Sequence, residues 1–291
     1  MYNKNIEVIK IEEPLLFAPR FITNFSLTND KKIQNINKKN IIVTSGPTNE
    51  RIDAVMKITN MSTGALGAIV ADELLKEDEL GKLYYISPKL AYKPRTKSER
   101  LELVQIESAV DLLKALKDII TNNDIYGVIH SAAVGDYYGE YAITGEQLAS
   151  LIASEVYNKD LDKYELEKTI LEVIKNPDMI TDNTHKISSY QDNLMVKLGL
   201  TPKVISSIKE FDPSIKLIGF KLLDGVSKEE LISVASRLRE KNKADYIVAN
   251  DLSRIGNGKH YATIINEDGI YKECETKDDI SKTLRKILFK Y

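Results

Sequence analysis

Small and hydroxyl-bearing residues gather in two segments that lie close together in the sequence. The first is Gly46-Pro47-Thr48, and the second runs from Asn60 to Gly67 as N-M-S-T-G-A-L-G. Such a segment can bind a phosphate group, because glycine lets the anion approach the backbone N–H groups, hydroxyls add donors, and a helix N-terminus adds partial positive charge. Asn60, Ser62 and Thr63 are equally suited to cap the helix that follows. From composition alone, both interpretations stay open.

The spacing of these segments differs from that of the common nucleotide-binding motifs. The pattern is neither G-x-G-x-x-G nor a Walker loop. Roughly fifteen residues separate the first segment from the helix, whereas a dinucleotide-binding fold turns from strand to helix almost at once. A phosphate site here would therefore be built by a different loop.

A second candidate group follows the apolar residues Val128 and Ile129. Small residues at a strand end, as in Ala132–Gly135, let a ligand lie against the backbone, and Asp136 can accept from hydroxyl or amine donors or serve in a turn. His130 suits a ligand contact or a buried structural position equally well. Asn250 also follows a buried strand, where ligand contacts occur in open parallel sheets.

Short β-branched segments alternate with longer amphipathic ones from Asn40 onward. The predicted strands are residues 41–44, 83–86, 101–104, 128–129, 217–220 and 246–249, and the predicted helices are 64–75, 109–120 and 228–241. This alternation predicts an α/β fold: a Rossmann-like, open, mostly parallel sheet with helices on both faces. Asp268-Gly269, between strand-like residues 261–265 and 270–273, predicts a C-terminal β-hairpin, followed by a helix over 278–289.

Two regions break this alternation and set the expected domain organisation. Residues 1–39 end in a polar stretch rich in Asn and Lys, which is typical of an N-terminal arm or linker. Residues 40–291 form the expected folded domain. Within it, residues 137–200 are more polar and irregular, which predicts an excursion that acts as a flap or a dimerisation arm.

The composition is that of an ordinary soluble globular protein. The chain has 291 residues, 43% of them hydrophobic and 29% charged, and a net charge of −2. A nucleic-acid-binding domain would be strongly basic, so nucleic acid is excluded as a partner, whereas a small anion held by local charge is not. The single cysteine, Cys274, excludes a disulfide framework. No apolar run approaches the ~20 residues of a membrane span, so we expect a cytoplasmic protein without membrane association.

Several motifs together resemble the phosphopantothenoylcysteine synthetase family, in order and spacing, from about residue 40 to the C-terminus. They are Val43-Thr44-Ser45-Gly46-Pro47-Thr48, Ile58-Thr59-Asn60-Met61-Ser62-Thr63-Gly64, Ala132-Ala133-Val134-Gly135-Asp136-Tyr137, Thr201-Pro202-Lys203, Ile218-Gly219-Phe220-Lys221 and Ile247-Val248-Ala249-Asn250-Asp251-Leu252. The resemblance is to the stand-alone bacterial form, because the residues ahead of the motifs are too few for the flavin-dependent decarboxylase domain of the bifunctional form.

The resemblance implies a ligase of coenzyme A biosynthesis that acts in two steps. The carboxylate of 4'-phosphopantothenate attacks the α-phosphate of CTP or ATP, which gives an acyl nucleotidylate and pyrophosphate. The amine of L-cysteine then attacks the acyl carbon and releases the nucleoside monophosphate. Because two anions must meet, the site needs backbone donors, lysines and Mg²⁺, whose protein ligands the sequence does not identify. The bacterial resemblance favours CTP, and the family is homodimeric.

Individual roles follow from the resemblance. Asn60 is expected to hold the carboxylate and the acyl intermediate, because an amide donates to an anion without adding charge. The nucleotide phosphates are expected to lie against Gly46, Ser62, Gly64 and Gly67.

The motif around the second strand end is expected to bind both substrates. Ala132, Ala133 and Asp136 match the Ala-Ala-Val-x-Asp-Tyr motif of the family. His130 and Ser131 precede it and are expected to contact the base.

Later segments are expected to add nucleotide contacts. They are Pro202, Lys203, Val204, Ile205, Phe220, Arg237, Lys241 and Asn250. Arg237 and Lys241 lie four residues apart, so one helix face would direct both towards one phosphate cluster. Phe220 fits a hydrophobic core at least as well as a platform for the base.

Lys186 is the second expected catalytic residue. It occupies the first position of Lys186-Ile187-Ser188-Ser189, where the bifunctional enzymes have Lys-x-Lys-Lys on a mobile flap. The resemblance implies that this first lysine contacts the acyl nucleotidylate and the nucleotide. The alternative is a solvated surface lysine, which is where most lysines lie.

Two other sequence patterns and two other functions are less consistent with the sequence. Tyr164 and Lys168 have the spacing of a dehydrogenase pair but lie in a charged run typical of a solvated helix face, and Cys274 and His260 show no metal-ligand spacing. An NAD(P)-dependent oxidoreductase shares the fold class but lacks its glycine fingerprint here. A non-catalytic nucleotide-binding regulator would bind CTP or ATP without turnover.

Overall fold

The computed structural model describes residues 38–289, so the expected arm at 1–39 lies almost wholly outside the described residues. The core is an eight-stranded sheet in the order β12-β11-β10-β9-β6-β1-β4-β5. Its strands are β1 (Lys39–Thr44), β4 (Leu80–Pro88), β5 (Leu101–Ile106), β6 (Gly127–His130), β9 (Lys216–Leu223), β10 (Tyr246–Gly256), β11 (Lys259–Asn266) and β12 (Gly269–Cys274). The strands from β5 to β10 run parallel, whereas β11 and β12 are antiparallel. The predicted mostly parallel sheet and C-terminal hairpin are confirmed.

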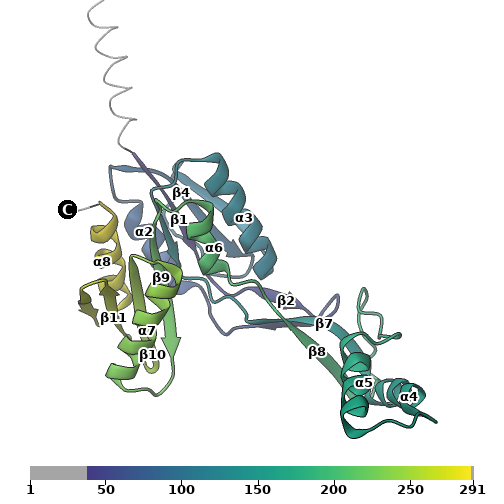
Figure 1. The fold of residues 1–291 in the computed structure, drawn as a ribbon. Helices are drawn as coiled ribbons and strands as arrows, with labels where there is room; N and C mark the ends of the chain where they lie inside the picture. Colours follow the sequence, from purple (N-terminus) through teal and green to yellow (C-terminus); the bar gives the residue numbers. More distant parts are fainter. Residues whose placement is uncertain (1–37, 290–291) are drawn as a thin grey trace, which may run out of the picture.

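Helices cover both faces of the sheet (Figure 1). On one face α2 (Ala65–Leu74) packs against α8 (Lys277–Phe289), and on the other lie α3 (Ala109–Asn122), α6 (Val204–Phe211) and α7 (Lys228–Asn242). The central strand β1 shows why: Ile41, Ile42 and Val43 alternate between the two faces and are all fully buried. Such a continuous apolar run is typical of a strand covered on both sides.

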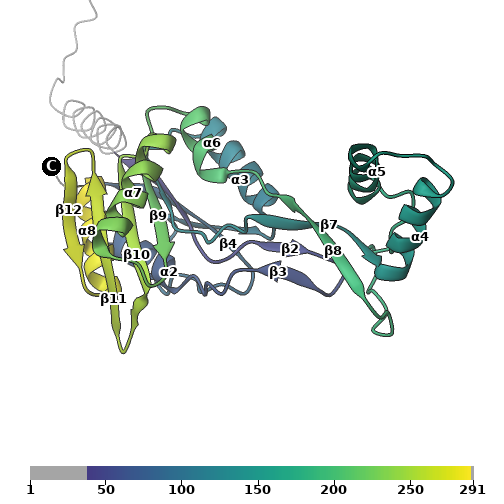
Figure 2. The ribbon, with the colours of Figure 1, turned by 60° about the horizontal axis from the view of Figure 1, so that its bottom comes forward.

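A long projection leaves the sheet between β6 and β9 (Figures 1 and 2). Its two strands, β7 (Tyr137–Thr144) and β8 (Leu194–Leu200), form an antiparallel ribbon that ends in α4 (Gly145–Val156) and α5 (Lys163–Lys175). Neither helix contains a buried residue. The predicted excursion at 137–200 is therefore a distinct arm, and its role in closure or dimerisation stays a prediction.

A short hairpin lies along the base of the arm. Its strands are β2 (Asn49–Arg51) and β3 (Lys57–Thr59), and β2 contacts β7. Figure 2 shows the hairpin running beside β7 and β8, towards the arm and away from the sheet. It links the end of β1 to the segment that precedes α2, and it therefore carries both phosphate-loop motifs at its base.

Two remaining interpretations can be compared with the structure. Tyr164 and Lys168 lie on α5 and are exposed, which supports a solvated helix face. Cys274 is buried, and its sulfur lies 3.7 Å from the hydroxyl of Thr283. Among the described residues, no helix is both long enough and apolar enough to span a bilayer.

Candidate active site

The order of the strands creates a topological switch point at the carboxyl ends of β1 and β6. From β1 the chain proceeds to β4 and β5 on one side, then returns to β6 and continues to β9 and β10 on the other. Thr44 and His130, the last residues of β1 and β6, are paired in register. Ligands of open α/β sheets bind outside the carboxyl ends of the strands at such a switch point, and both main motifs follow these two strands.

Close packing brings the two motifs together around Ser45. A Cβ atom placed on Gly67 would lie 2.2 Å from Ser45 Oγ and 2.9 Å from Ser131 Oγ, so only glycine fits there. Gly46 has a φ of +79°, and a Cβ at this position would lie 2.6 Å from the Cβ of Ala91. The first turn of α2 thus lies directly against the ends of β1 and β6.

The start of α2 has no side-chain cap. Its N-cap is Gly64, in the left-handed conformation, and the first turn contains no acidic residue. Ser62 and Thr63 make only long contacts of 3.4 Å with the following N–H groups. The helix-cap interpretation of Asn60 is wrong, because its side chain bonds elsewhere. The uncapped N–H groups and the helix dipole are the features that an anion requires.

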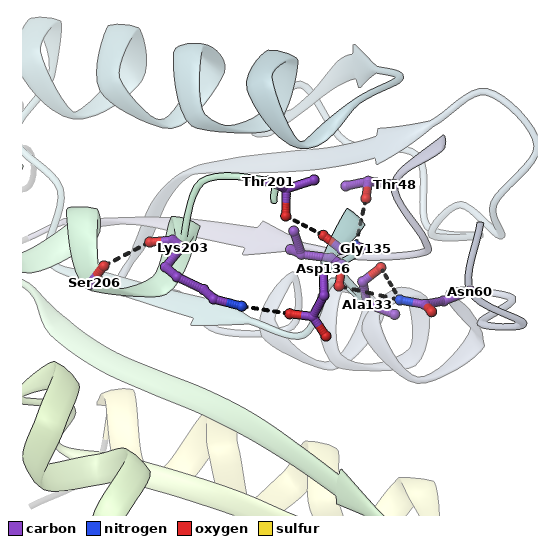
Figure 3. A network of polar contacts seen from close by, with 9 residues as sticks. Thr48, Asn60, Ala133, Gly135, Asp136, Thr201, Lys203 and Ser206 are labelled. Carbon is purple, nitrogen blue, oxygen red and sulfur yellow. Dashed lines mark hydrogen bonds and ion pairs between the residues drawn. The ribbon is translucent and has the colours of Figure 1, made fainter. Parts of the chain in front are cut away.

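Asn60 connects the phosphate loop to the segment after β6 (Figure 3). Its amide nitrogen lies 3.1 Å from the carbonyl oxygen of Ala133 and 3.3 Å from that of Val134. The residue is exposed. Two carbonyl acceptors therefore orient a solvent-facing amide between the two motifs.

The segment after β6 is also tied to the segment after β8 (Figure 3). The Thr201 hydroxyl donates to the carbonyl of Gly135, and the Gly135 N–H donates to Thr48 Oγ1 at 2.9 Å. Lys203 Nζ lies 2.6 Å from Asp136 Oδ1, and both side chains are largely exposed. A surface ion pair of this kind contributes little stability, so an incoming anion could compete for Lys203 at low cost.

His130 occupies a structural position at the switch point. It is 6% exposed, and its Nδ1 lies 2.9 Å from Thr44 Oγ1. Burial lowers the pKa of His130 to about 4, so the imidazole is neutral near pH 7. Because Thr44 Oγ1 accepts the N–H of Ala132 at 3.2 Å, its own proton is free to bond His130. The buried structural alternative accounts for these contacts, and base contact stays a prediction.

The nucleotide contacts predicted from later segments separate into two groups. Pro202 and Lys203 adjoin the Asp136 segment, but Val204 is 2% exposed and packs with Ile205 in the core beneath α6. Phe220 lies against the core on the opposite face of the sheet. The side chain of Val204 is therefore occupied by core packing, and contact of the 202–205 segment with the nucleotide stays a prediction.

Two further predictions concern α7 and β10. Arg237 and Lys241 lie in the second half of α7, which returns the chain from the carboxyl end of β9 to the amino end of β10. That direction carries them away from the carboxyl ends of the strands, and their contact with the nucleotide stays a prediction. Asn250 is buried, and its amide donates to the carbonyl of Tyr261 at 3.1 Å.

Lys186 is exposed and lies at the far end of the β2–β3 hairpin from Asn60. The next residue, Ile187, is buried, and its N–H lies 2.9 Å from Asp53 Oδ2 at the hairpin tip. The structure therefore does not bring the two expected catalytic residues together, although one hairpin connects them.

Lys93 and Asp53 were missed by the sequence reasoning. Lys93 Nζ lies 2.7 Å from Ser87 Oγ and 2.5 Å from the carbonyl of Pro88, and burial lowers its pKa. No carboxylate pairs with it among the described residues. The backbone N–H of its neighbour Tyr92 donates to the carbonyl of Thr63 at 3.0 Å, which places this loop over the start of α2. The sequence signal that could have identified Lys93 is its position shortly after the predicted parallel strand at residues 83–86.

The donor set fits Mg²⁺ that is bound together with a nucleotide. Within the described part of the chain, no three His, Cys, Asp or Glu side chains form a metal-binding cluster. Mg²⁺ is commonly held by one or two carboxylates together with substrate phosphates and water. Asp136 is the exposed carboxylate of the assembled motifs, so it is the residue that would hold the ion beside the phosphates.

Comparison with known sequences identifies relatives across most of the chain. The model of the DNA/pantothenate metabolism flavoprotein C-terminal domain family matches residues 36–150 and 178–291. The coenzyme A biosynthesis bifunctional protein CoaBC of Thermococcus kodakarensis is 27% identical over 230 residues, which cover 79% of this chain and 45% of that protein. CoaBC of Bacillus subtilis is 25% identical over 251 residues, with coverage of 84% and 49%. The chain spans about half the length of these curated relatives.

Comparison with solved structures agrees. The DNA/pantothenate metabolism flavoprotein from Streptococcus pneumoniae superposes with a TM-score of 0.68 at 33% identity, covering 84% of this chain and 96% of that one. A Cab2 variant in complex with phosphopantothenate-cysteine has a TM-score of 0.60 at 14% identity and covers 94% of each chain, which shows a shared fold. The chain belongs to the DNA/pantothenate metabolism flavoprotein C-terminal domain family, whose members include the synthetase-like domain of the coenzyme A biosynthesis proteins.

Proposed function

We propose that this chain is a ligase that joins 4'-phosphopantothenate to L-cysteine through an acyl nucleotidylate, with CTP as the preferred nucleotide. One observation carries the proposal. The exposed amide of Asn60 is fixed between the uncapped start of α2 and the Ala132–Asp136 segment, at the switch point of the sheet. That arrangement joins an anion site to a neutral donor for a carboxylate, within a family of coenzyme A biosynthesis proteins.

In the first step a carboxylate oxygen of phosphopantothenate attacks the α-phosphorus, and pyrophosphate leaves. The N–H groups at Gly64 and Ala65 would hold phosphate oxygens. Lys203 would leave its ion pair with Asp136 and bind the triphosphate instead. Mg²⁺ would supply charge neutralisation when bound. Asn60 would orient the attacking carboxylate without adding a competing charge.

In the second step the amine of cysteine attacks the acyl carbon, a C–N bond forms and the nucleoside monophosphate leaves. Negative charge grows on the former carboxylate oxygen and on the departing phosphate. The Lys186 ammonium and the Asn60 amide are the proposed donors to these atoms, and the Asn60 NH₂ would exchange its bonds to the carbonyls of Ala133 and Val134 for the substrate. Since Lys186 lies beyond the hairpin tip in this structure, the segment that carries it would have to approach a reaction centre for this step.

A pyrophosphate-release assay tests the proposal. We expect release that depends on phosphopantothenate and is faster with CTP than with ATP, GTP or UTP. Asn60→Asp should abolish it, since a carboxylate at this position would repel the substrate carboxylate. Absence of pyrophosphate with all four triphosphates would refute the ligase function.

The two alternative functions predict different results. An NAD(P)-dependent oxidoreductase would bind a nicotinamide cofactor, whereas here a long segment, including the β2–β3 hairpin, separates β1 from α2. A non-catalytic regulator would bind CTP or ATP in calorimetry yet release no pyrophosphate when both other substrates are added.

We also propose a homodimer that uses the arm. Its helices α4 and α5 bury no residue, and large side chains such as Tyr157 and Leu171 are exposed. Light scattering should give about twice the 32.8 kDa of one chain. A mass of one chain at working concentration would contradict this and require each site to work alone.

A further inference from the structure

Asp53 has an unusual set of hydrogen bonds for a hairpin-turn residue. Its Oδ1 accepts the N–H groups of Val55 and Met56, each at 2.6 Å, whereas its Oδ2 accepts the N–H of Ile187 at 2.9 Å. The residue is 3% exposed. The N–H bonds from Met56, Ile187 and Val55 hold the pKa of Asp53 below its usual value, so the group is a carboxylate near pH 7.

The two oxygens have separate tasks. The bonds to Oδ1 close the turn between β2 and β3, as Asp side chains commonly do in local turns. The bond to Oδ2 is not needed for that turn, because its donor lies 134 residues away, on the arm. Ile187 is itself 4% exposed, so its segment is packed down at the hairpin tip.

This contact connects the two expected catalytic residues. Asn60 directly follows β3, at the base of the hairpin, and Lys186 directly precedes the residue held at the tip. The β2–β3 pairing from Asn49↔Thr59 to Arg51↔Lys57 joins base and tip. Lys186 immediately precedes Ile187, whose N–H bonds to Asp53 Oδ2, and the positive charge of Lys186 also helps to lower the pKa of Asp53.

We infer that Asp53 is a positioning residue that holds the Lys186 segment to the β2–β3 hairpin and so sets the place from which Lys186 reaches the acyl nucleotidylate. This inference rests on the proposed ligase function. In this arrangement the hairpin and the segment that carries Lys186 form one unit. The position of that unit therefore decides whether Lys186 can contact the acyl nucleotidylate, in its own chain or in a partner chain.

Asp53→Asn separates the two tasks. The amide oxygen can replace Oδ1 in the turn, while the amide NH₂ then faces the N–H of Ile187 as donor against donor. The matched control is Asp182→Asn. Asp182 lies on the same segment, but its partners within residues 38–289 are local: it accepts hydrogen bonds from Thr184 N and Oγ1 and lies beside His185. Unlike Asp53, it therefore makes no bond between the segment and the hairpin in the described part of the chain. Should Asp53→Asn fail to fold, Asp53→Ser keeps one turn acceptor and lacks the second oxygen.

The test measures the two steps separately in single turnovers of full-length wild type, Asp53→Asn, Lys186→Gln, the double variant and Asp182→Asn. We expect Asp53→Asn to form acyl nucleotidylate and pyrophosphate normally but to transfer the acyl group to cysteine about tenfold more slowly, the low end for loss of a charge-assisted hydrogen bond. The double variant should be no slower than Lys186→Gln alone, because nothing remains to be positioned, and Asp182→Asn should match wild type.

Two results would overturn the inference: unchanged acyl transfer in Asp53→Asn, or a double variant in which the two defects multiply. A structural role alone would affect both steps or only the melting temperature. Hydrogen exchange supplies a readout independent of activity, since the amide of Ile187 should exchange faster in Asp53→Asn, and unchanged exchange would show that no such contact forms. If the wild type releases no pyrophosphate, the proposed function fails and the catalytic role of Asp53 with it, while exchange still decides the contact.

Discussion

The buried histidine at the switch point makes stability depend on pH in a defined window. The pKa of His130 is about 4 in the folded protein, because burial disfavours the charged imidazole, against about 6.5 in an unfolded chain. Between these values the unfolded state binds the proton and the folded state does not. The contribution of His130 is therefore fully present above about pH 6.5, falls as the pH falls towards 4, and levels off below it.

The magnitude follows from the two pKa values. Proton linkage gives a loss of about 1.4 kcal/mol at pH 5.5 and about 3 kcal/mol at pH 4, relative to the limit at high pH. His130→Asn keeps a neutral acceptor for the Thr44 hydroxyl but does not titrate. The free energy of unfolding in urea, measured at pH 7, 5.5 and 4, should therefore fall less steeply in the variant.

Comparing wild type with His130→Asn cancels the contributions that the other titrating groups make to the pH dependence of stability. His260, whose pKa burial also lowers, and the carboxylates with lowered pKa values contribute equally to wild type and variant. If the two curves ran parallel from pH 7 to pH 4, His130 would not be buried as a neutral group and the reasoning would be refuted.

Three further predictions concern the site and its supports. Lys186→Gln should form acyl nucleotidylate but pass it to cysteine about 10²–10³-fold more slowly, so that rapid-quench mass spectrometry detects the accumulated intermediate; equal loss of both steps would instead assign the lysine to nucleotide binding. Gly67→Ala should lower the free energy of unfolding by about 1–3 kcal/mol, the usual cost of overpacking, because its Cβ would meet Ser45 Oγ, whereas Gly135→Ala, with its nearest atom at 3.5 Å, should not. Removal of residues 1–37 should leave turnover largely intact, since every matched motif lies beyond them; a folded truncation with little activity would place that segment in the site.

The parallel sheet and its site edge could be predicted because their signals are local. Buried runs such as Ile41–Thr44 and Tyr246–Ala249, each followed by polar or small residues, fix both the strands and the edge at which motifs meet. Asn60 and Ala133 were assigned to one site by the resemblance of their motifs, not by strand direction, because Asn60 follows the β2–β3 hairpin, which the sequence did not predict. In the structure the Asn60 amide lies 3.1 Å from the carbonyl oxygen of Ala133.

Sequence reasoning carried less information where position depends on helix direction or on contacts distant in sequence. Spacing placed Arg237 and Lys241 on one face of α7 but did not indicate how far along the returning helix they lie. Val204 belongs to a segment assigned to the nucleotide, but its own side chain is buried on the apolar face of α6. The Asp53–Ile187 bond spans 134 residues, and no periodicity in either segment encodes it.

The arm also explains how this fold accommodates extra sequence. The family match omits residues 151–177, which run from within α4 to just beyond α5, whereas both ribbon strands are matched. Thr144 pairs with Leu194 at the foot of the helices, and Gly145 N donates to the carbonyl of Asn193 at 3.0 Å. The ribbon is thus closed below the insertion, and each doubling of a flexible loop adds only about 0.6 kcal/mol of closure entropy. The tip of the arm is accordingly the place where the chain can change in length while the register of β7 and β8, and the edge of the sheet at which the motifs meet, stay unchanged.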